Sequence, residues 1–226
     1  QDRMRPQEVA CFARALQADA SQFATFDLLE AATALSYYER FDMVLIGGSG
    51  DYSAVGEEAW LLRTLDAMRQ LHDLGKPTFA SCWGFQAFAR AMGGTVVHDQ
   101  SRAEIGTKRI RLTDAGRADP LFGNLDDTFE AQMGHEDCVD VLPPRATLLA
   151  STDLVENQAY RFDDAPIYCT QFHPELNREN LLQRIRAYPS YIERIAGVTL
   201  AEFEAGCHDT PAVEALLPRF VKMCLA

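Results

Sequence analysis

Apolar residues recur along this chain at spacings that alternate between helix and strand. Residues 7–18 (QEVACFARALQA) carry apolar positions at near-helical spacing, and residues 57–74 form the clearest amphipathic helix. Between them, residues 41–48 (FDMVLIGG) form a continuous apolar run closed by glycines, which is typical of a buried strand. A strand over 77–81 and a helix over 84–92 follow. This order predicts a parallel sheet with helical crossovers.

The pattern changes from residue 94 to residue 172, where short strand-like runs lie between turn residues. We expect these runs to form extra antiparallel strands. After Pro174 the spacing is helical again, and helices over 178–188 and within 190–226 are predicted. The segment 190–226 is therefore expected to be a helical extension packed on a main domain that spans 1–189.

An apolar stripe runs along this predicted extension, and it must be buried in this chain or in a second copy of it. A homodimer is therefore an open alternative. The residues of the stripe are Leu200, Phe203, Leu216, Leu217, Phe220 and Val221.

The start of the chain departs from the usual α/β alternation. Most domains with this pattern begin with a strand, whereas the first predicted element here is a helix. We therefore expect the first strand of the sheet to precede Gln1.

Composition narrows the class of protein. Of the 226 residues, 47% are hydrophobic and 24% are charged, which is enough to build a globular core. The net charge of -12 argues against nucleic acid as the main partner. No apolar run approaches the length of a membrane span, and no signal peptide is visible. We therefore expect a cytoplasmic protein without a membrane partner. Because the chain does not begin with Met, a removed leader stays an alternative.

The six cysteines show no spacing typical of a zinc site or of a redox pair. We expect no metal site, and we expect the thiols other than Cys82 to be reduced and buried.

Cys82 stands apart because it lies where a predicted strand becomes a predicted helix, in the segment Ala80-Ser81-Cys82-Trp83-Gly84. An abrupt strand-to-helix turn between small residues exposes the side chain of the turn residue, as in a nucleophile elbow. A helix N-terminus also favours a thiolate, and the N–H of Trp83 is free to bind an oxyanion. A buried structural cysteine at a strand end is the alternative.

A second candidate is the segment Gln171-Phe172-His173-Pro174-Glu175. His173 follows a predicted strand, and Glu175 points the same way if the chain stays extended around Pro174. A cysteine nucleophile needs a base, and the base needs an orienting partner. The alternative is a surface ion pair.

A third candidate is the glycine-rich strand end 46–51 (IGGSGD). Glycines there let backbone N–H groups approach a ligand, as in an oxyanion hole, although a tight turn or a weak phosphate loop fits the same residues. All three segments follow predicted strands, and ligands of open parallel sheets bind beyond the carboxyl ends of strands.

The combination of LIGGSGDYS, ASCWGFQ, MGHEDCVDVLP and TQFHPE, over residues 40–180, resembles the class I (triad) glutamine amidotransferases, and most of all the amidotransferase domain of GMP synthase. The resemblance implies a flavodoxin-like α/β fold, with a mostly parallel sheet flanked by helices. It departs from the family at Ala80, where glycine is usual, and at Gly134 and Glu136, which replace the serine and glycine around His135.

The resemblance also implies roles for individual residues. Cys82 would be the nucleophile, His173 the general base and acid, and Glu175 the residue that orients His173. Gly48 and Trp83 would supply the oxyanion N–H groups. Glutamine would be held by three further residues, namely Gln86, His135 and Asp137.

The expected activity is hydrolysis of the glutamine side-chain amide through a cysteinyl thioester, with no metal or organic cofactor. Nothing in the sequence resembles an ATP-binding synthetase, so the ammonia acceptor is expected on another chain, as a synthase subunit. A γ-glutamyl hydrolase of another amide or peptide is the first alternative. A non-catalytic binding protein on the same fold is the second.

Overall fold

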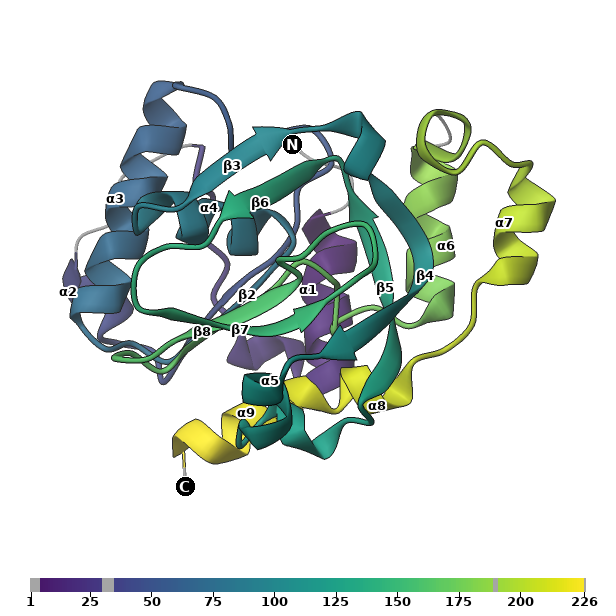
Figure 1. The fold of residues 1–226 in the computed structure, drawn as a ribbon. Helices are drawn as coiled ribbons and strands as arrows, with labels where there is room; N and C mark the ends of the chain where they lie inside the picture. Colours follow the sequence, from purple (N-terminus) through teal and green to yellow (C-terminus); the bar gives the residue numbers. More distant parts are fainter. Residues whose placement is uncertain (1–4, 30–34, 189–190, 226) are drawn as a thin grey trace.

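A seven-stranded mixed sheet forms the centre of the computed structural model, which describes residues 5–29, 35–188 and 191–225 (Figure 1). A separate two-stranded ribbon pairs β3 with β6. The strands are β1 (Val44–Ile46), β2 (Thr78–Ser81), β3 (Thr95–His98), β4 (Glu104–Leu112), β5 (Thr128–His135), β6 (Asp137–Val141), β7 (Ala146–Ser151), β8 (Ala159–Phe162) and β9 (Ile167–Thr170).

The strand order is β1-β2-β9-β8-β7-β4-β5. The first three strands are parallel to one another, and every pair from β9 to β5 is antiparallel. The α/β class and the extra antiparallel strands are confirmed, and the antiparallel strands continue the parallel ones within a single sheet. The sheet is therefore mixed, with two parallel and four antiparallel pairs, and most connections within 94–172 are shorter than the roughly twelve residues that a helical crossover needs.

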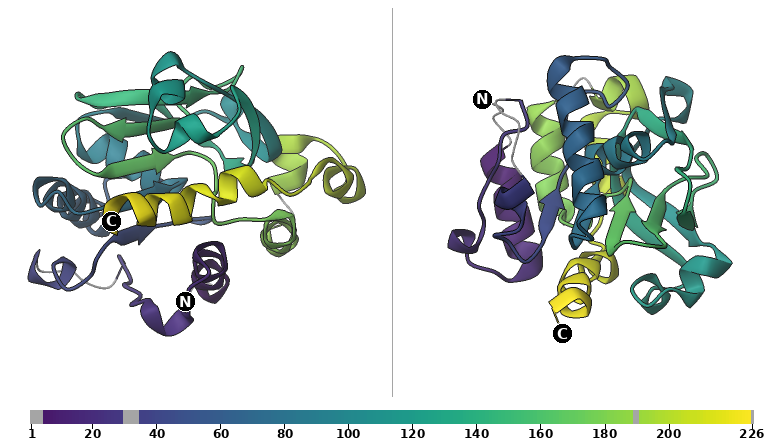
Figure 2. Two further views of the ribbon diagram at one scale, coloured as in Figure 1. Left: turned by 90° about the horizontal axis from the view of Figure 1, so that it is seen from below. Right: turned by 90° about the vertical axis from the view of Figure 1, so that its left-hand side faces the viewer.

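Helices cover both faces of this sheet, and alternate residues of β2 show the division. Phe79 packs in a cluster with α1 and α9, whereas Ala80 packs in a second cluster with α3 and α4. Figure 2 shows α9 crossing the sheet on the same side as α1. The helices are α1 (Arg5–Leu16), α2 (Leu35–Tyr38), α3 (Ala59–Asp73), α4 (Trp83–Ala91), α5 (Asp114–Ala118), α6 (Arg178–Ala187), α7 (Leu200–Gly206), α8 (Pro211–Glu214) and α9 (Leu216–Leu225).

The apolar stripe of the C-terminal helices is largely buried within this chain. Leu216, Leu217 and Phe220 join the α1 side of the core, and Phe203 is buried beside α6, whereas Leu200 stays 43% exposed. One helix was expected over 211–225, but two are present. Pro218 explains the break because it has no N–H to donate to the carbonyl of Glu214.

The fold brings together the three candidate segments that contain Cys82, His173 and Gly48. Since β1, β2 and β9 are parallel neighbours, their carboxyl ends lie at one edge of the sheet, where Gly47, Cys82 and Gln171 follow. None of the helices in the described residues is long and apolar enough to cross a bilayer.

Candidate active site

Cys82 occupies a sharp turn between β2 and α4. Its backbone angles, φ 52° and ψ −104°, are rare for a residue with a side chain, and its N–H donates to the Thr170 carbonyl at 2.8 Å. The turn needs a small residue at Gly84, because a Cβ there would lie 2.9 Å from the backbone oxygen of Ile46. The small residues around Cys82 predicted this sharp turn, but the side chain of Cys82 is buried rather than exposed.

His173 and Glu175 lie just beyond the end of β9 and are both buried. The Nδ1 atom of His173 is 2.6 Å from Glu175 Oε1, so the carboxylate fixes the orientation of the ring. The backbone N–H of His173 donates to the Gln132 carbonyl at 2.9 Å, which anchors the loop on β5.

Gly48 lies where the histidine and the cysteine meet. A Cβ on Gly48 would lie 2.8 Å from His173 Cε1 and 3.6 Å from Cys82 Sγ, so the structure brings Gly48, Cys82 and His173 together and leaves no room for a side chain at position 48. The thiol of Cys82 is also 3.6 Å from the Gly134 carbonyl oxygen. The predicted nucleophile, base and orienting residue therefore form one continuous group.

Charge pairing dominates the electrostatics of this group. Burial lowers the pKa of His173, but Glu175 and Cys82 outweigh burial and raise that pKa to about 10. Burial raises the pKa of Glu175, but His173 and Arg184 lower it by more, so the carboxyl is ionised at neutral pH. Arg184 Nη1 lies 3.8 Å from Glu175 Oε1.

Two charged residues beside the site were not predicted from the sequence. Glu8 of α1 accepts a hydrogen bond from the Gly48 N–H at 3.0 Å, and Arg184 of α6 lies 3.7 Å from the same carboxylate. Burial raises the pKa of Glu8. The Gly48 N–H is thus directed at Glu8, and it can serve an oxyanion only when this hydrogen bond opens.

The residues expected to hold glutamine are buried and bonded to one another. Gln86 donates both to the Asp137 carbonyl at 2.9 Å and to Gln171 Oε1 at 3.1 Å. His135 lies 3.2 Å from the Asp137 carbonyl through Nδ1, and the Asp137 carboxylate accepts from Ser53. This network fixes α4 against β6, so it shapes the wall of the site.

Two groups of side chains border the site. Trp83 stacks on Trp60 with ring centroids 5.9 Å apart, and Tyr52 meets Trp60 edge-on at 5.3 Å. On the other side Arg194 pairs with Glu136 at 2.6 Å.

No metal site is visible near these residues. Among the described residues, no group of three or more His, Cys, Asp or Glu side chains is arranged to hold a metal ion.

Comparison with known proteins places this geometry in a family. The chain is 32% identical over 131 residues to a GMP synthase (glutamine-hydrolyzing) from Streptomyces avermitilis, an alignment that covers 58% of this chain and 24% of the relative. It thus spans about a quarter of that relative's length. It is 28% identical over 189 residues to gamma-glutamyl peptidase 4 of Arabidopsis thaliana, covering 81% of this chain and 74% of the relative.

Solved structures agree on the fold. A glutamine amidotransferase from Thermotoga maritima superposes with a TM-score of 0.70 at 21% identity, over 83% of this chain and 79% of that one. The family model of the class-I glutamine amidotransferases matches residues 20–185, which is most of the chain. This chain belongs to the class-I glutamine amidotransferase family.

Proposed function

We propose that this protein hydrolyses the side-chain amide of glutamine and releases ammonia. The observation that carries the proposal is the convergence of Cys82, His173 and Glu175 at the carboxyl ends of β2 and β9, with the 2.6 Å bond between His173 and Glu175. A thiol, a base beside it and a carboxylate that orients the base are the groups that acyl transfer through a thioester requires.

The reaction begins at the thiol of Cys82. His173, whose pKa is raised to about 10, already holds the proton of the thiol, and the sulfur attacks the amide carbon of glutamine. Negative charge develops on the amide oxygen, where the N–H of Trp83 and, once it is released from Glu8, the N–H of Gly48 stabilise it. His173 then gives its proton to the departing nitrogen, the C–N bond breaks, and ammonia leaves a γ-glutamyl thioester.

Water completes the cycle. His173 takes a proton from a water molecule, whose oxygen attacks the thioester carbon, and the C–S bond breaks to release glutamate. The sulfur of Cys82 leaves beside protonated His173, which restores the starting pair. Glu175 stays ionised throughout and stabilises the imidazolium at both steps. This sequence of steps uses no metal and no organic cofactor.

We place the ammonia acceptor outside these 226 residues, on a synthase subunit. The GMP synthases that align with this chain are glutamine-hydrolyzing enzymes by name, and the chain spans 24% to 28% of two of them. We place the protein in the cytoplasm, which its six unpaired cysteines favour, since reducing compartments keep thiols free.

A γ-glutamyl peptidase activity is the second candidate. Gamma-glutamyl peptidases 3 and 4 of Arabidopsis thaliana align over 80% and 81% of this chain, and they cover more of their own length than the GMP synthases do. The same triad would serve, with an amine in place of ammonia as the leaving group. The stacked rings of Trp60 and Trp83 favour the smaller leaving group because they narrow the site.

Substrate competition tests the proposal. Ammonia release from glutamine and amine release from γ-glutamyl derivatives of bulky amines are measured with and without a candidate synthase subunit. We expect a higher kcat/KM for glutamine, complete loss of both activities in Cys82→Ala, and normal activity in the control Cys224→Ala. A higher kcat/KM for the bulky amides would favour the peptidase, and no turnover of either substrate would favour a binding protein.

A further inference from the structure

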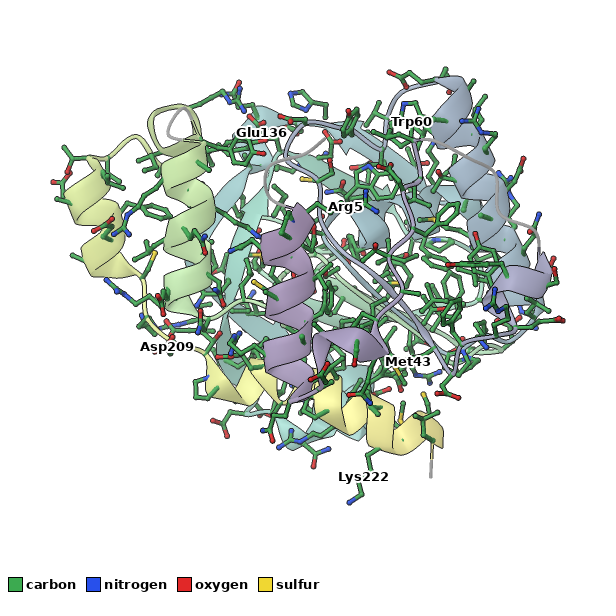
Figure 3. All side chains as sticks on the ribbon, turned by 180° about the vertical axis from the view of Figure 1, so that it is seen from behind. Arg5, Met43, Trp60, Glu136, Asp209 and Lys222 are labelled. Carbon is green, nitrogen blue, oxygen red and sulfur yellow. The ribbon has the colours of Figure 1, made fainter. Side chains whose placement is uncertain are left out.

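A charged pair borders the active site on the side away from Trp60. Arg194 Nη2 donates to Glu136 Oε2 at 2.6 Å, and the guanidinium also lies over the ring of Tyr191, 4.9 Å from its centroid. The side chains of Glu136 and Arg194 are 14% and 44% exposed, so both are accessible to a bound molecule. Figure 3 shows Glu136 and Trp60 at the same end of the molecule, Glu136 on the side of α6 and Trp60 on the side of α3.

Arg194 belongs to a short helical turn, η4 (Ile192–Ala196), that is held at the end of the sheet. Ile192 is buried and packs in one cluster with Ile105 of β4. The residue before the turn, Tyr191, donates its O–H to the Gly50 carbonyl at 2.7 Å. The turn therefore connects the loop after β1 to β4, and it holds the guanidinium beside the turn between β5 and β6.

The pair lies within reach of the nucleophile. The Gly134 carbonyl oxygen is 3.6 Å from Cys82 Sγ, and Glu136 follows two residues later, which is at most about 7 Å along the backbone. Burial raises the pKa of Tyr191, and the charges of Glu136 and Cys82 raise it further, so both groups lie close to the phenol. The amide carbon and the α-carbon of glutamine are about 4 Å apart across three C–C bonds, so the α-substituents reach a similar distance from the thiol.

Open space borders the thiol on the Gly134 side. A Cβ on Gly134 would meet no atom within 4 Å beyond its neighbours in the chain. Gly134 and Glu136 replace the serine and glycine usual in the family, and Arg194 lies after residues 20–185, which the family model matches. The space and the two charges beside it are therefore features of this chain rather than of the family pattern.

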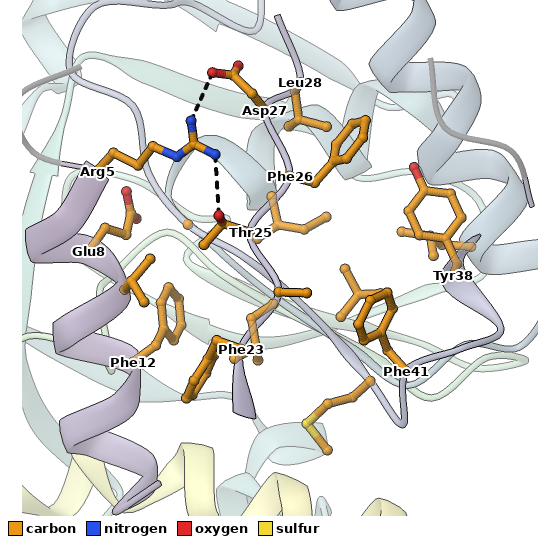
Figure 4. Close-up of a pocket in the computed structure, with 18 of the residues that line it drawn as sticks. Arg5, Glu8, Phe12, Phe23, Thr25, Phe26, Asp27, Leu28, Tyr38 and Phe41 are labelled. Carbon is orange, nitrogen blue, oxygen red and sulfur yellow. Dashed lines mark hydrogen bonds and ion pairs between the residues drawn. The ribbon is translucent and has the colours of Figure 1, made fainter. Parts of the chain in front are cut away.

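Another charged pair lies near the site but is separated from the thiol. Arg5 and Asp27 are bonded to each other in a groove of about 1210 Å³ beside the outer edge of β1 (Figure 4). The backbone at 47–48 lies between this groove and the thiol. A Cβ on Gly47 would meet Glu8 on the groove side, whereas a Cβ on Gly48 would meet the catalytic thiol.

The charges of Arg194 and Glu136 match those of a γ-glutamyl group, which carries an ammonium and a carboxylate on its α-carbon. In the described part of the chain, the guanidinium of Arg194 makes one hydrogen bond, to one oxygen of Glu136. Its other N–H groups are left to bind a carboxylate, for which the planar guanidinium is well suited. The second oxygen of Glu136 is left to accept from an ammonium group.

We propose that Arg194 binds the α-carboxylate, and Glu136 the α-ammonium, of the γ-glutamyl group whose amide carbon Cys82 attacks. The inference rests on the proposed amide hydrolysis at Cys82, and it defines the acyl side of the substrate as a γ-glutamyl group with both α-substituents free. A glutamine residue within a polypeptide carries neither charge and is excluded.

Glutamine and two analogues that each lack one charge test these contacts. Glutaramate lacks the α-ammonium, and 4-aminobutanamide lacks the α-carboxylate. We expect Arg194→Gln to lower kcat/KM about 30-fold for glutamine and glutaramate and to leave that for 4-aminobutanamide unchanged, because a charged hydrogen bond is lost only where the carboxylate is present. Glu136→Gln should lower kcat/KM about 30-fold for glutamine and 4-aminobutanamide and leave glutaramate unchanged. The control is Arg186→Gln, which removes an exposed partner of Glu204 and should change none of the three values.

Labelling of Cys82 tests the same contacts without turnover. A chloroketone analogue of glutamine carries both α-substituents, whereas iodoacetamide carries neither. We expect Arg194→Gln and Glu136→Gln each to slow labelling by the chloroketone about 30-fold, with iodoacetamide labelling unchanged. If this selectivity appears in a protein that hydrolyses no amide, then the proposed hydrolysis is wrong and recognition of the γ-glutamyl group is supported.

Two results would overturn the proposal. An equal loss of kcat/KM for all three amides in both variants, together with slower labelling by iodoacetamide, would show that the pair supports the loops around the thiol and does not bind substrate. An unchanged rate of labelling by the chloroketone in both variants would show that other groups hold the α-carbon.

Discussion

The two sides of β2 are built differently. On one side β2 pairs with β9 along its whole length, and every residue of both strands is buried. On the other side it pairs with β1, whose three residues are half-buried and whose outer edge borders the groove. Strand β2 therefore has a fully buried neighbour, β9, on its packed side, and a half-buried neighbour, β1, on its open side.

The catalytic groups are divided between the packed side and the open side of β2. Cys82 and His173 follow β2 and β9, so the packed side fixes the thiol against its base. Gly48 follows β1, and its N–H is directed at Glu8. We infer that the nucleophile and base are preorganised in this chain, whereas the second oxyanion donor depends on how β1 and α1 are held.

The largest expected effect concerns the reactivity of the thiols. An electrophilic glutamine analogue should label Cys82 at least about 100-fold faster than any other cysteine at pH 8, because His173 lies beside Cys82 at the N-terminus of α4. Burial raises the pKa of Cys11 to about 11 and that of Cys138 to about 12, and it also raises the pKa of Cys169, Cys207 and Cys224.

Peptide mapping by mass spectrometry measures this selectivity. His173→Gln should slow the labelling of Cys82 and leave the other five thiols unchanged. A label found mainly on the half-buried Cys224 would show that exposure, rather than the neighbouring base, controls reactivity.

The next effect is a pH dependence of stability on the packed side. The pKa of His173 is about 10 in the folded protein and about 6.5 in the unfolded chain, so its ion pairing stabilises the fold fully below pH 6.5. That contribution is lost as the pH rises from 6.5 through 10. The stability difference between wild type and His173→Gln should shrink by roughly 4 kcal/mol over that range, since one pKa unit corresponds to about 1.4 kcal/mol.

Urea unfolding at pH 6 and pH 10 measures this change. The Cys224→Ala protein is the control, because Cys224 lies in α9 outside the site. A constant difference between wild type and His173→Gln at both pH values would mean that the histidine is neutral in the folded protein.

The sequence predicted the packed side better than the open side, for physical reasons. The elbow around Cys82 and the pair of His173 and Glu175 depend on residues within a few positions of one another, so their spacing shows in the sequence. The contact of Glu8 with Arg184 joins residues far apart in the chain, so no local sequence pattern predicts it. Gln86 was expected to hold glutamine, but its side-chain amide donates to the Asp137 carbonyl and to Gln171 within the wall of the site.

The fold shows the same limit. Strand positions followed from apolar runs, whereas the pairs β2-β9 and β4-β7 join segments far apart in the chain, and no local pattern predicts them. The break before α9 could have been predicted, because Pro218 lies within the first turn.

Substitution of Gly84 or Gly116 by alanine compares how tightly the open and packed sides of the sheet are held. A Cβ on Gly84 would lie 2.9 Å from the Ile46 oxygen, and a Cβ on Gly116 would lie 2.1 Å from the Leu149 oxygen. Both glycines are helical, so the gain in helix propensity is similar. An added methyl group that overpacks the core lowers the free energy of unfolding by about 1–3 kcal/mol. Strand β1 has a groove on its outer side into which it can shift, whereas β7 is held between β8 and β4.

We therefore expect Gly116→Ala to lower the free energy of unfolding by roughly 1–2 kcal/mol more than Gly84→Ala does. Urea unfolding of both variants measures the difference. If Gly84→Ala is the costlier change, then β1 is held as firmly as β7, and the division between the two sides of β2 is wrong.

The smallest expected effect tests the open side directly. Glu8 accepts the N–H of Gly48, and Arg184, 3.7 Å away, favours the ionised form of its carboxyl against burial. A hydrogen bond to a charged acceptor is stronger than one to a neutral acceptor by about 1 kcal/mol. Glu8→Gln keeps the size of the side chain but removes the charge, so the Gly48 N–H is released more easily to an oxyanion. We expect kcat for glutamine to rise roughly fivefold, which is what about 1 kcal/mol provides, with little change in KM.

The measurement of kcat for Glu8→Gln needs a control for charge, because Glu8 has charged neighbours. Arg184 lies against Glu8 and Glu175, and His173 is close enough to affect the pKa of Glu8, so the variant also changes the field at the triad. Asp19→Asn, an exposed substitution beyond the end of α1, removes a negative charge without contacting the site and should leave kcat unchanged. A fall in kcat for Glu8→Gln would mean that Glu8 supports the catalytic loop rather than restraining it. The second oxyanion donor would then be as well ordered as the thiol and its base.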